Sequence, residues 1–526
     1  MFLKSSKDAK QSLEVSVVRT DPFYPPPPFH PALNYPEYPY SDRFIASQPN
    51  PVYAAVRDAL HLLGLDTKNF GTPFWNPFRE ILSGVAKVLV KPNFVNHFNP
   101  ISDEQPHFEA LVTQGAIIRP ILDYLALASE GGLQVVLGDS PVQSANLKAL
   151  LRRAGIDSAV DFVQTQFQGR CRISIVDFRE TMMRTDPSGA LLGRVNLAGD
   201  PGGYITVDLG SDSALTPFEG RESLFRVADY DPLRMIQMHS NGHHQYVLPR
   251  TILECGFIIN VPKLKLHKKT GVTLSLKGVV GVAGDKASLP HYRVGDPEQG
   301  GDECQSKTLI TSARQRWLYP LRGKGKNTWR LALPMGRMLM RVNQILHRGD
   351  PLSGVRDGDW YGNDTIWRTI HDLNRIVFFS DQSGRLRDKP QRKYFTLVDG
   401  IVGGDGDGPL KPNPVFSGLV IAGFDPLAVD IACTRLMGLD WQKIPLFARY
   451  DLGKKYPFSS FDGDLSMILL RSSDPDFNIP LPYVSPVHRF RPSHGWKGYV
   501  ELPDAESSDR SQAPPSRKHH AISPAD

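Results

Sequence analysis

The sequence predicts an α/β protein with a mostly parallel or mixed sheet flanked by helices. Short apolar runs typical of buried strands recur along the chain, and segments with helical spacing of apolar residues separate them. Polar residues follow several of these runs directly, as they do where strands end at a ligand crevice. The chain has 526 residues, of which 40% are hydrophobic and 22% are charged. It can therefore bury a large core and form more than one domain.

The alternation of helices and strands begins at Pro51. The apolar pattern predicts helices over 52–63, 116–128 and 146–154, and strands over 86–90, 133–137, 173–176, 205–207, 257–259, 396–398 and 419–422. A further helix is marked by Asp425 as its N-cap, Pro426 at its first position and Gly438 just beyond its end. Strands that alternate with helices favour a sheet covered on both faces.

Five regions are predicted along the chain. Residues 21–51 contain too many prolines for a helix or a central strand, and their aromatic side chains favour an arm wrapped over the domain surface instead of a free polyproline linker. The regions are a Pro/Tyr-rich arm (1–50), a first α/β part with a Lys-rich segment (51–305), a basic helical insertion (306–375), a second α/β part with an acidic glycine loop (376–480) and an irregular or disordered tail (481–526).

The insertion is strongly basic. Residues 306–350 contain ten Lys or Arg residues and one acid, Asp350, and residues 331–345 have the spacing of a cationic helix. A surface helical insertion explains this pattern most simply. A lid over the site and weak association with a membrane surface are the alternatives.

Charge and cysteine content limit the class of protein. The formal net charge of +6 is modest for this length, so we expect no nucleic-acid partner. The four cysteines (171, 255, 304 and 433) are dispersed without a CxxC motif, so we expect no iron–sulfur cluster and a reducing compartment. Neither a signal peptide nor an apolar run of about 20 residues is recognisable, and a cytoplasmic location is therefore predicted.

The segment 256–284 is the most informative part of the chain. It reads GFIINVPKLKLHKKTGVTLSLKGVVGVAG and contains six Lys or His residues (Lys263, Lys265, His267, Lys268, Lys269 and Lys277) but no acid. Cations this close repel one another unless solvent or an anion offsets the repulsion. Alternation over 261–267 places the first three of these cations on one side of an extended chain, and Thr273 and Lys277 share a face in a helix or a strand. We interpret the segment as an anion-binding wall.

Polar residues stand at the ends of several predicted strands. Lys91 and Asn93 follow one strand, Asp139 follows the next, Asp177 follows a third, Asn260 and Lys263 follow a fourth, and Asp399 follows a fifth. Because the carboxyl ends of parallel strands meet at one edge of a sheet, these side chains are expected to converge on one cleft.

Two motifs in the glycine-rich stretches have tempting but unsuitable spacings. The glycines 278, 281 and 284 match neither a P-loop nor a dinucleotide fingerprint, so close backbone packing is the better interpretation. The loop GGDGDGPLKPNP begins like a calcium loop, but Pro409 and Phe416 stand where oxygen ligands are required. A divalent ion held by Asp399, Asp405 or Asp407 together with a substrate oxygen remains an alternative.

Several of these motifs also resemble a known family. The segments VLVKPNF, INVPKLKLHKKTGVTLSLKGVVG, DKASLPHY, VDGIVGGDGDGP and AGFDPLAVD resemble the family called domain of unknown function 362, over about residues 87–439. The family implies a fold and a site position but no reaction. This chain lacks the ferredoxin-like cysteine motifs of some relatives. The matching residues are Lys91, Asn93, Asn260, Pro262, Lys263, Lys265, His267, Thr273, Lys277, Gly278, Lys286, His291, Asp399, Gly408, Asp425 and Asp430.

Together, these patterns predict an enzyme that acts on a small carboxylate or phosphate by Lys/His acid–base chemistry, such as an isomerase, epimerase or lyase. The predicted catalytic residues are His267, Lys277, His291 and Asp399, and the predicted substrate-binding residues are Lys91, Asn93, Asp139, Asn260, Lys263, Lys265, Thr273 and Lys286. One alternative is a metal-dependent phosphoryl-transfer or hydrolytic enzyme. Another is a non-catalytic protein that binds an anion or an acidic partner in an assembly.

Overall fold

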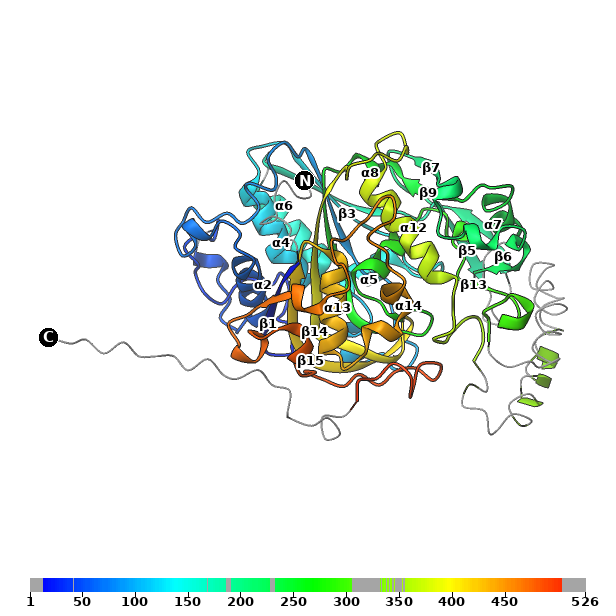
Figure 1. The fold of residues 1–526 in the computed structure, drawn as a ribbon. Coiled ribbons are helices and arrows are strands. Elements are labelled where there is room, and N and C mark those ends of the chain that lie inside the picture. Colours follow the sequence, from blue (N-terminus) through cyan, green and yellow to red (C-terminus); the bar gives the residue numbers. More distant parts are fainter. Residues whose placement is uncertain are drawn as a thin grey trace.

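The centre of the molecule is a mixed β-sheet. A computed structural model describes residues 13–40, 42–167, 169–185, 191–227, 232–304 and 355–503, together with isolated positions between 332 and 352 (Figure 1). The main path of the sheet has the strand order β16-β1-β15-β14-β10-β2-β3-β4, and β11 joins it beside β14. The predicted α/β class with a mostly parallel or mixed sheet is confirmed.

Parallel strands form one half of this sheet. Strands β10, β2, β3 and β4 run parallel to one another, and β10 is also parallel to β14. On the other half, β15 is antiparallel to both β14 and β1. The strands are β1 (Glu14–Arg19), β2 (Lys87–Pro92), β3 (Leu133–Asp139), β4 (Cys171–Asp177), β10 (Phe257–Val261), β11 (Lys263–His267), β12 (Gly271–Val272), β14 (Lys393–Asp407), β15 (Lys411–Gly423) and β16 (Leu469–Arg471).

Helices cover the two faces of the sheet, as Figure 1 shows. Side chains of α2, α4, α5 and α6 belong to one apolar core, and those of α8, α9, α12, α13 and α14 belong to the other. Central strands therefore bury both faces and are apolar throughout, which is why they appeared as continuous hydrophobic runs. The helices are α2 (Pro51–Leu62), α3 (Gln105–Glu109), α4 (Gly115–Ala128), α5 (Leu147–Arg153), α6 (Ile156–Gln166), α7 (Pro232–Met238), α8 (Arg250–Glu254), α9 (Ser275–Gly278), α12 (Ile366–Phe379), α13 (Pro426–Leu436) and α14 (Pro445–Ala448).

The helix α13 has the ends that its sequence predicts. The Asp425 side chain accepts hydrogen bonds from the N–H groups of Leu427 and Ala428, and Pro426 occupies the first position. Gly438 follows the end of the helix with φ of +80°, a conformation that glycine adopts without steric cost. Local sequence therefore determines both ends of this helix.

The hairpin of β14 and β15 extends past the sheet and forms one side of the candidate site. An irregularity between Gly400 and Val402 shifts its register. Beyond β10, strand β11 takes over the pairing with β14, so that Lys263 lies opposite Asp399 and Lys265 lies opposite Gly404. The Lys-rich segment thus continues the sheet at its carboxyl edge.

Three two-stranded sheets lie outside the main sheet. The predicted strand 205–207 belongs to β7 (Tyr204–Asp208), which pairs with β9 (Gln245–Pro249) and not with a central strand. The other pairs are β5 (Thr181–Thr185) with β6 (Leu191–Asn196), and β8 (Phe225–Arg226) with β13 (Tyr292–Arg293). The hairpin of β5 and β6 forms a wall of the pocket described below.

The N-terminal residues pack closely against the rest of the molecule. Strand β1 lies between β15 and β16. After it, Phe29 is buried in the core on the α2 side, and Glu37 pairs with Arg57 at 2.6 Å. Arg119 of α4 donates to the carbonyl of Pro28. These contacts hold the proline-rich segment against helices α2 and α4.

The structure describes only part of the predicted insertion and of the predicted tail. Positions 331, 333, 337, 340, 343 and 344 of the predicted basic helix 331–345 and all of residues 504–526 lie outside the described residues, whereas the described positions of 331–345 are helical. The final part of the predicted insertion contains α12, which is buried among the helices of its face. In the predicted tail, Trp496 is buried in the core. Within the described residues, no helix has the length and apolar character required to cross a bilayer.

Candidate functional site

The carboxyl edge of the sheet brings the predicted strand-end residues together in two groups. Strands β2 and β3 place Lys91 beside Asp139, and strands β11 and β14 place Lys263 beside Asp399. Asn260 on β10 is in register with Lys91 on β2, so their side chains leave the same face of the sheet.

The first group centres on a buried ion pair. Lys91 Nζ lies 3.0 Å from Asp139 Oδ1, and both side chains are almost completely buried. The N–H of Ser140 donates to Oδ1 and the N–H of Phe94 donates to Oδ2 of the same carboxylate. Lys91 also donates to the carbonyl of Pro92. Both carboxylate oxygens of Asp139 therefore have partners within the protein.

A glycine packs directly on this ion pair. A Cβ atom at position 281 would lie 1.9 Å from Asp139 Oδ1 and 2.7 Å from Lys91 Nζ, which only a glycine avoids. The Gly281 carbonyl accepts a hydrogen bond from the Ser140 N–H. Gly278 and Gly284 also have close neighbours, at Asn260 and Tyr204. The prediction that these three glycines serve close packing is confirmed.

In the second group, Lys263 and Asp399 are bound to partners within the protein. Lys263 Nζ lies 3.0 Å from Asp399 Oδ2, and both side chains are fully buried. The Tyr24 hydroxyl bridges the pair: it donates to Asp399 Oδ1 at 2.5 Å and accepts from Lys263 Nζ at 2.6 Å. The N–H of Gln114 donates to Asp399 Oδ2. Asp399, one of the predicted catalytic residues, thus has partners on both oxygens.

Three further lysines lie near the first group. Burial, then the charges of Lys277 and Lys263, holds the pKa of Lys265 far below its usual value, and its amine donates to the carbonyl of Leu111 at 2.5 Å. Burial, then the charge of Lys91, lowers the pKa of Lys277 to about 8. Burial also lowers the pKa of Lys286 to about 7. A buried ammonium loses hydration, so neighbouring cations make its proton easier to release.

Lys277 differs from the other lysines because it has no hydrogen-bond partner within the described part of the chain. By contrast, Lys286 donates to the carbonyls of Ser140 and, at 2.8 Å, Pro141. The Lys277 ammonium is thus a largely buried cation whose N–H donors form no hydrogen bond within the described part of the chain. Such a group is suited to bind an anion or to exchange a proton.

Two histidines belong to the same electrostatic cluster. His267 Nδ1 accepts a hydrogen bond from the N–H of Lys269, so the neutral ring carries its proton on Nε2. His291 Nδ1 donates to the carbonyl of Leu289, which leaves Nε2 as an acceptor. Burial, with added repulsion from nearby lysines, lowers the pKa of His267 well below its usual value and that of His291 to about 3. Both rings are therefore neutral near pH 7.

Several buried polar atoms of the predicted site have no partner in the described structure. They are Asn93 Oδ1, Asn260 Oδ1 and Thr273 Oγ1. Asn260 uses its amide nitrogen to donate to Ser275 and to the Tyr394 hydroxyl, which fixes the orientation of the side chain. Buried polar groups are normally satisfied, so unpaired ones near a cation cluster indicate a place for a ligand or water.

The backbone between Thr273 and Lys277 is neither one helix nor one strand. Strand β12 ends at Val272, Leu274 adopts φ of +40°, and helix α9 begins at Ser275. The expectation that one helix or one strand spans these residues is wrong, because the backbone of Leu274 has a positive φ and ends the extended conformation before α9 begins. The N–H groups of Ser275 and Leu276 donate to Asp430 of α13. This contact fixes the start of α9 and therefore the position of Lys277.

The candidate metal ligands do not converge. Asp405 pairs with Arg491 at 2.7 Å, Asp399 is held by Lys263, and Asp407 is exposed. Among the described residues, no three His, Cys, Asp or Glu side chains form a group that could hold a metal ion. The donor set of these three carboxylates therefore does not fit a shared ion in this conformation.

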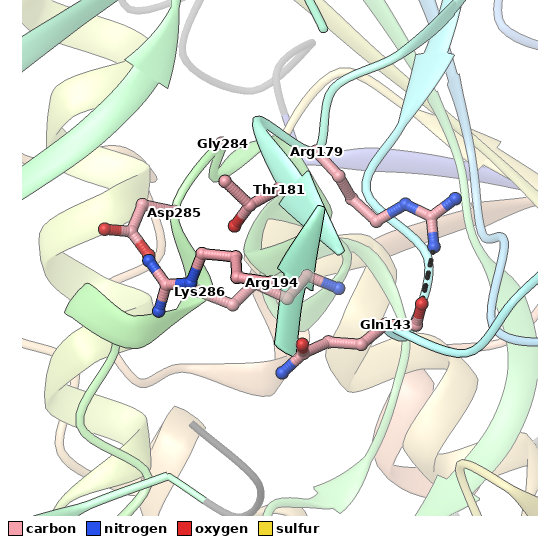
Figure 2. A pocket seen from close by; sticks show the side chains of 7 residues that line it. All are labelled: Gln143, Arg179, Thr181, Arg194, Gly284, Asp285 and Lys286. Carbon is pink, nitrogen blue, oxygen red and sulfur yellow. Dashed lines mark hydrogen bonds between the residues drawn. The ribbon is translucent and has the colours of Figure 1, made fainter. Parts of the chain in front are cut away.

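A small pocket adjoins the first group. Its empty volume of about 300 Å³ includes open solvent. Lys286, Arg179 and Arg194 line the pocket, and Figure 2 shows the guanidinium of Arg179 turned toward the carbonyl of Gln143. Arg179 forms an ion pair with Asp177 at 2.6 Å and donates to the carbonyls of Val142, Gln143 and Ala145. The lining residues are Gln143, Arg179, Thr181, Arg194, Gly284, Asp285 and Lys286.

Some residues of the site were not expected from the sequence. Tyr24 comes from the proline-rich segment, where nothing in its neighbourhood indicates contact with Lys263. Arg179 and Arg194 were also missed. Arg179 stands two residues after Asp177 at the end of β4, and the pattern of polar residues after strands indicated Asp177 but did not extend to Arg179.

The comparisons with known proteins agree with the sequence motifs. A search among curated proteins finds no match. The sequence model of the family described as Domain of unknown function (DUF362) matches residues 215–435, which include Lys263, Lys277 and Asp399. Over residues 215–435, the chain is therefore similar to the DUF362 family.

Proposed function

We propose that this protein is an enzyme that transfers a proton on a small carboxylate or phosphate substrate, and that Lys277 is the acid–base group. The observation that carries the proposal is the environment of Lys277. Its amine is largely buried, lacks a hydrogen-bond partner in the described structure and lies close enough to Lys91 and Asp139 to feel their charges. A cation in this position gains most from an anionic ligand.

The charge balance around Lys277 favours an anion. Lys91, Lys277 and Lys286 supply three amines. Asp139 contacts Lys91 directly and acts on Lys277 and Lys286 through its charge. Asp139 is already engaged by Lys91 and two backbone N–H groups. A bound carboxylate would offset part of the remaining repulsion and would raise the pKa of Lys277 only in part, because burial still favours the neutral amine.

Lys277 is better suited than the histidines to accept a proton. A general base works best when its pKa lies near the working pH, and the pKa of Lys277 is about 8. His291, with a pKa of about 3, is a weak base. In the proposed step the neutral Lys277 amine removes a proton from the carbon beside the substrate carboxylate. The electron pair moves into the carboxylate to form an enediolate, and the same ammonium returns the proton.

The other polar groups would stabilise the extra negative charge. The Nε2–H of His267 is a donor, and Lys286 retains one N–H beyond the two that contact carbonyls. Donors that are fixed before the reaction stabilise a developing oxyanion effectively. Asn260, whose amide is oriented by Ser275, would accept a hydrogen bond from a substrate hydroxyl or amine through Oδ1.

Hydrogen exchange tests the proposal directly. Small 2-hydroxy and 2-amino carboxylates are incubated with the protein in D2O, and NMR follows the loss of the C–H signal beside the carboxylate. We expect exchange with the wild-type protein and at least about 100-fold slower exchange with Lys277→Met. Lys148→Met, which removes an exposed lysine of α5, is the matched control.

Two outcomes would contradict the proposal. If Lys277→Met exchanges deuterium at the wild-type rate, Lys277 is not the acid–base group. If the wild-type protein binds these carboxylates without exchange or product formation, the anion site belongs to a binding protein. Binding is followed independently by the ligand-induced rise in melting temperature.

A further inference from the structure

We infer that the substrate carries a second anionic group, which binds between Arg194 and Lys286 in the pocket beside the Lys277 cluster. This inference rests on the proposed function, because it places the first anionic group at Lys277. It adds the substrate class: a dianion, either a dicarboxylate or a phosphorylated carboxylate. Arg194 would be the residue that selects for it.

Lys286 connects the pocket to the cluster. Its side chain lines the pocket, yet its pKa is lowered by burial and by the charges of Lys277, Arg179 and Lys91, so it lies near all three. Its contacts with the carbonyls of Ser140 and Pro141 hold the amine at the junction. An anion that touches Lys286 from the pocket side is therefore a neighbour of one bound at Lys277.

The pocket has an excess of positive charge. Arg194 has no hydrogen bond or ion pair within the described part of the chain, and its side chain is exposed. The one acidic residue on the wall, Asp285, is paired with Arg234 at 3.2 Å. The guanidinium of Arg179 is already bound to Asp177 and to backbone carbonyls, so Arg179 contributes its charge and forms a rigid wall of the pocket. Free guanidinium donors are thus supplied by Arg194.

The geometry also explains how such a group would enter. Figure 2 shows the side chains of Arg194 and Lys286 crossing in the pocket, with the Arg194 guanidinium toward Asp285 and the Lys286 amine at the opposite end. Strand β6, which carries Arg194, belongs to a two-stranded hairpin outside the main sheet. The interior is narrow, so the long Arg194 side chain must move to admit a group larger than water. Its exposure permits this movement without disturbing the core.

Anion affinities of three variants test the inference. The probes are unbranched dicarboxylates from malonate to adipate, the monocarboxylates of equal length, and inorganic phosphate. Arg194→Ala removes the free guanidinium, and Arg172→Ala removes an exposed arginine of β4 as a matched control. Lys277→Met tests the first anion site separately.

We expect at least one dicarboxylate to bind the wild-type protein about tenfold more tightly than its monocarboxylate partner. Arg194→Ala should abolish this advantage and leave monocarboxylate binding unchanged, whereas Arg172→Ala should alter neither. If phosphate alone shows the dependence on Arg194, the second group is a phosphate; if only dicarboxylates show it, the group is a carboxylate.

The failures of the two proposals are distinguishable. If Arg194→Ala retains the same ratio of dicarboxylate to monocarboxylate affinity and the same phosphate affinity as wild type, the second anion subsite is wrong, and the function proposed for Lys277 stands. If Lys277→Met leaves every affinity unchanged, the proposed function itself fails. Arg194 is exposed, so its replacement is expected to leave folding intact; equal melting temperatures of the two arginine variants would verify this.

Discussion

Lys91 Nζ and Asp139 Oδ1 are 3.0 Å apart at the carboxyl ends of two neighbouring parallel strands, and Gly281 closes over them. The pair is removed from water and is satisfied by backbone groups on several sides. Such a pair is costly to disrupt, because either partner alone would be a buried uncompensated charge. The pair is a rigid charged neighbour of Lys277 and Lys286.

Gly281→Ala should destabilise the protein by about 3 kcal/mol, because the new methyl group overlaps the Asp139 carboxylate and pushes it from Lys91. Chemical denaturation measures the change in the free energy of unfolding. Gly278→Ala is the graded control: its Cβ would lie 3.2 Å from Asn260 Nδ2, and we expect a loss of about 1 kcal/mol or less. Equal losses for the two variants would mean that the contact with Asp139 does not matter.

Lys277→Met should stabilise the folded protein at pH 7, by about 1–3 kcal/mol, because the charged amine is desolvated without a hydrogen-bond partner. The folded pKa of about 8 lies below the ordinary value of 10.5. The unfolded chain therefore binds more protons between these values, and wild-type stability rises with pH across that window.

The advantage of the Lys277→Met variant should consequently shrink from pH 8 upward and disappear above pH 10.5. Denaturation curves at several pH values, compared with those of Lys148→Met, check this. A stability difference that does not change with pH would show that Lys277 titrates normally in the folded protein.

Acetate binding at pH 8 should take up protons. Acetate is fully ionised at this pH, so any uptake comes from the protein. Bound negative charge raises the pKa values of Lys277 and Lys286, which are about 8 and 7 in the free protein. Calorimetric titration in two cationic buffers with different ionisation enthalpies measures up to about one proton per acetate. Zero uptake by the wild-type protein would contradict the assignment of acetate to this cluster.

Tyr24→Phe should lower the free energy of unfolding by about 1–3 kcal/mol, because the hydroxyl bridges Lys263 and Asp399 in a fully buried place. The matched control is Tyr35→Phe, whose hydroxyl makes no hydrogen bond within the described structure, and we expect a change within about 0.5 kcal/mol. Thermal and urea denaturation would report both. If Tyr24→Phe lowers the free energy of unfolding no more than the control does, the Tyr24 hydroxyl does not stabilise the Lys263–Asp399 ion pair.

Local sequence determined the type and the ends of many elements. Continuous apolar runs predicted the central strands because both faces of the sheet are covered. The Asp425, Pro426 and Gly438 pattern predicted both ends of α13, since capping depends on neighbouring residues alone. The absence of acidic residues from 256–284 predicted a cation cluster, and the structure shows Lys265 and Lys277 near Lys91.

Tertiary structure decided how these residues are partnered. The sequence placed Lys91, Asp139, Lys263 and Asp399 at strand ends, but strand order determined that Lys91 faces Asp139 and that Lys263 faces Asp399. No local pattern indicated that Tyr24 would occupy the second pair, because the contact spans more than two hundred residues of chain. The amine of Lys277 lacks a hydrogen-bond partner for the same physical reason: partners are set by packing between distant segments, and spacing along the chain does not specify them.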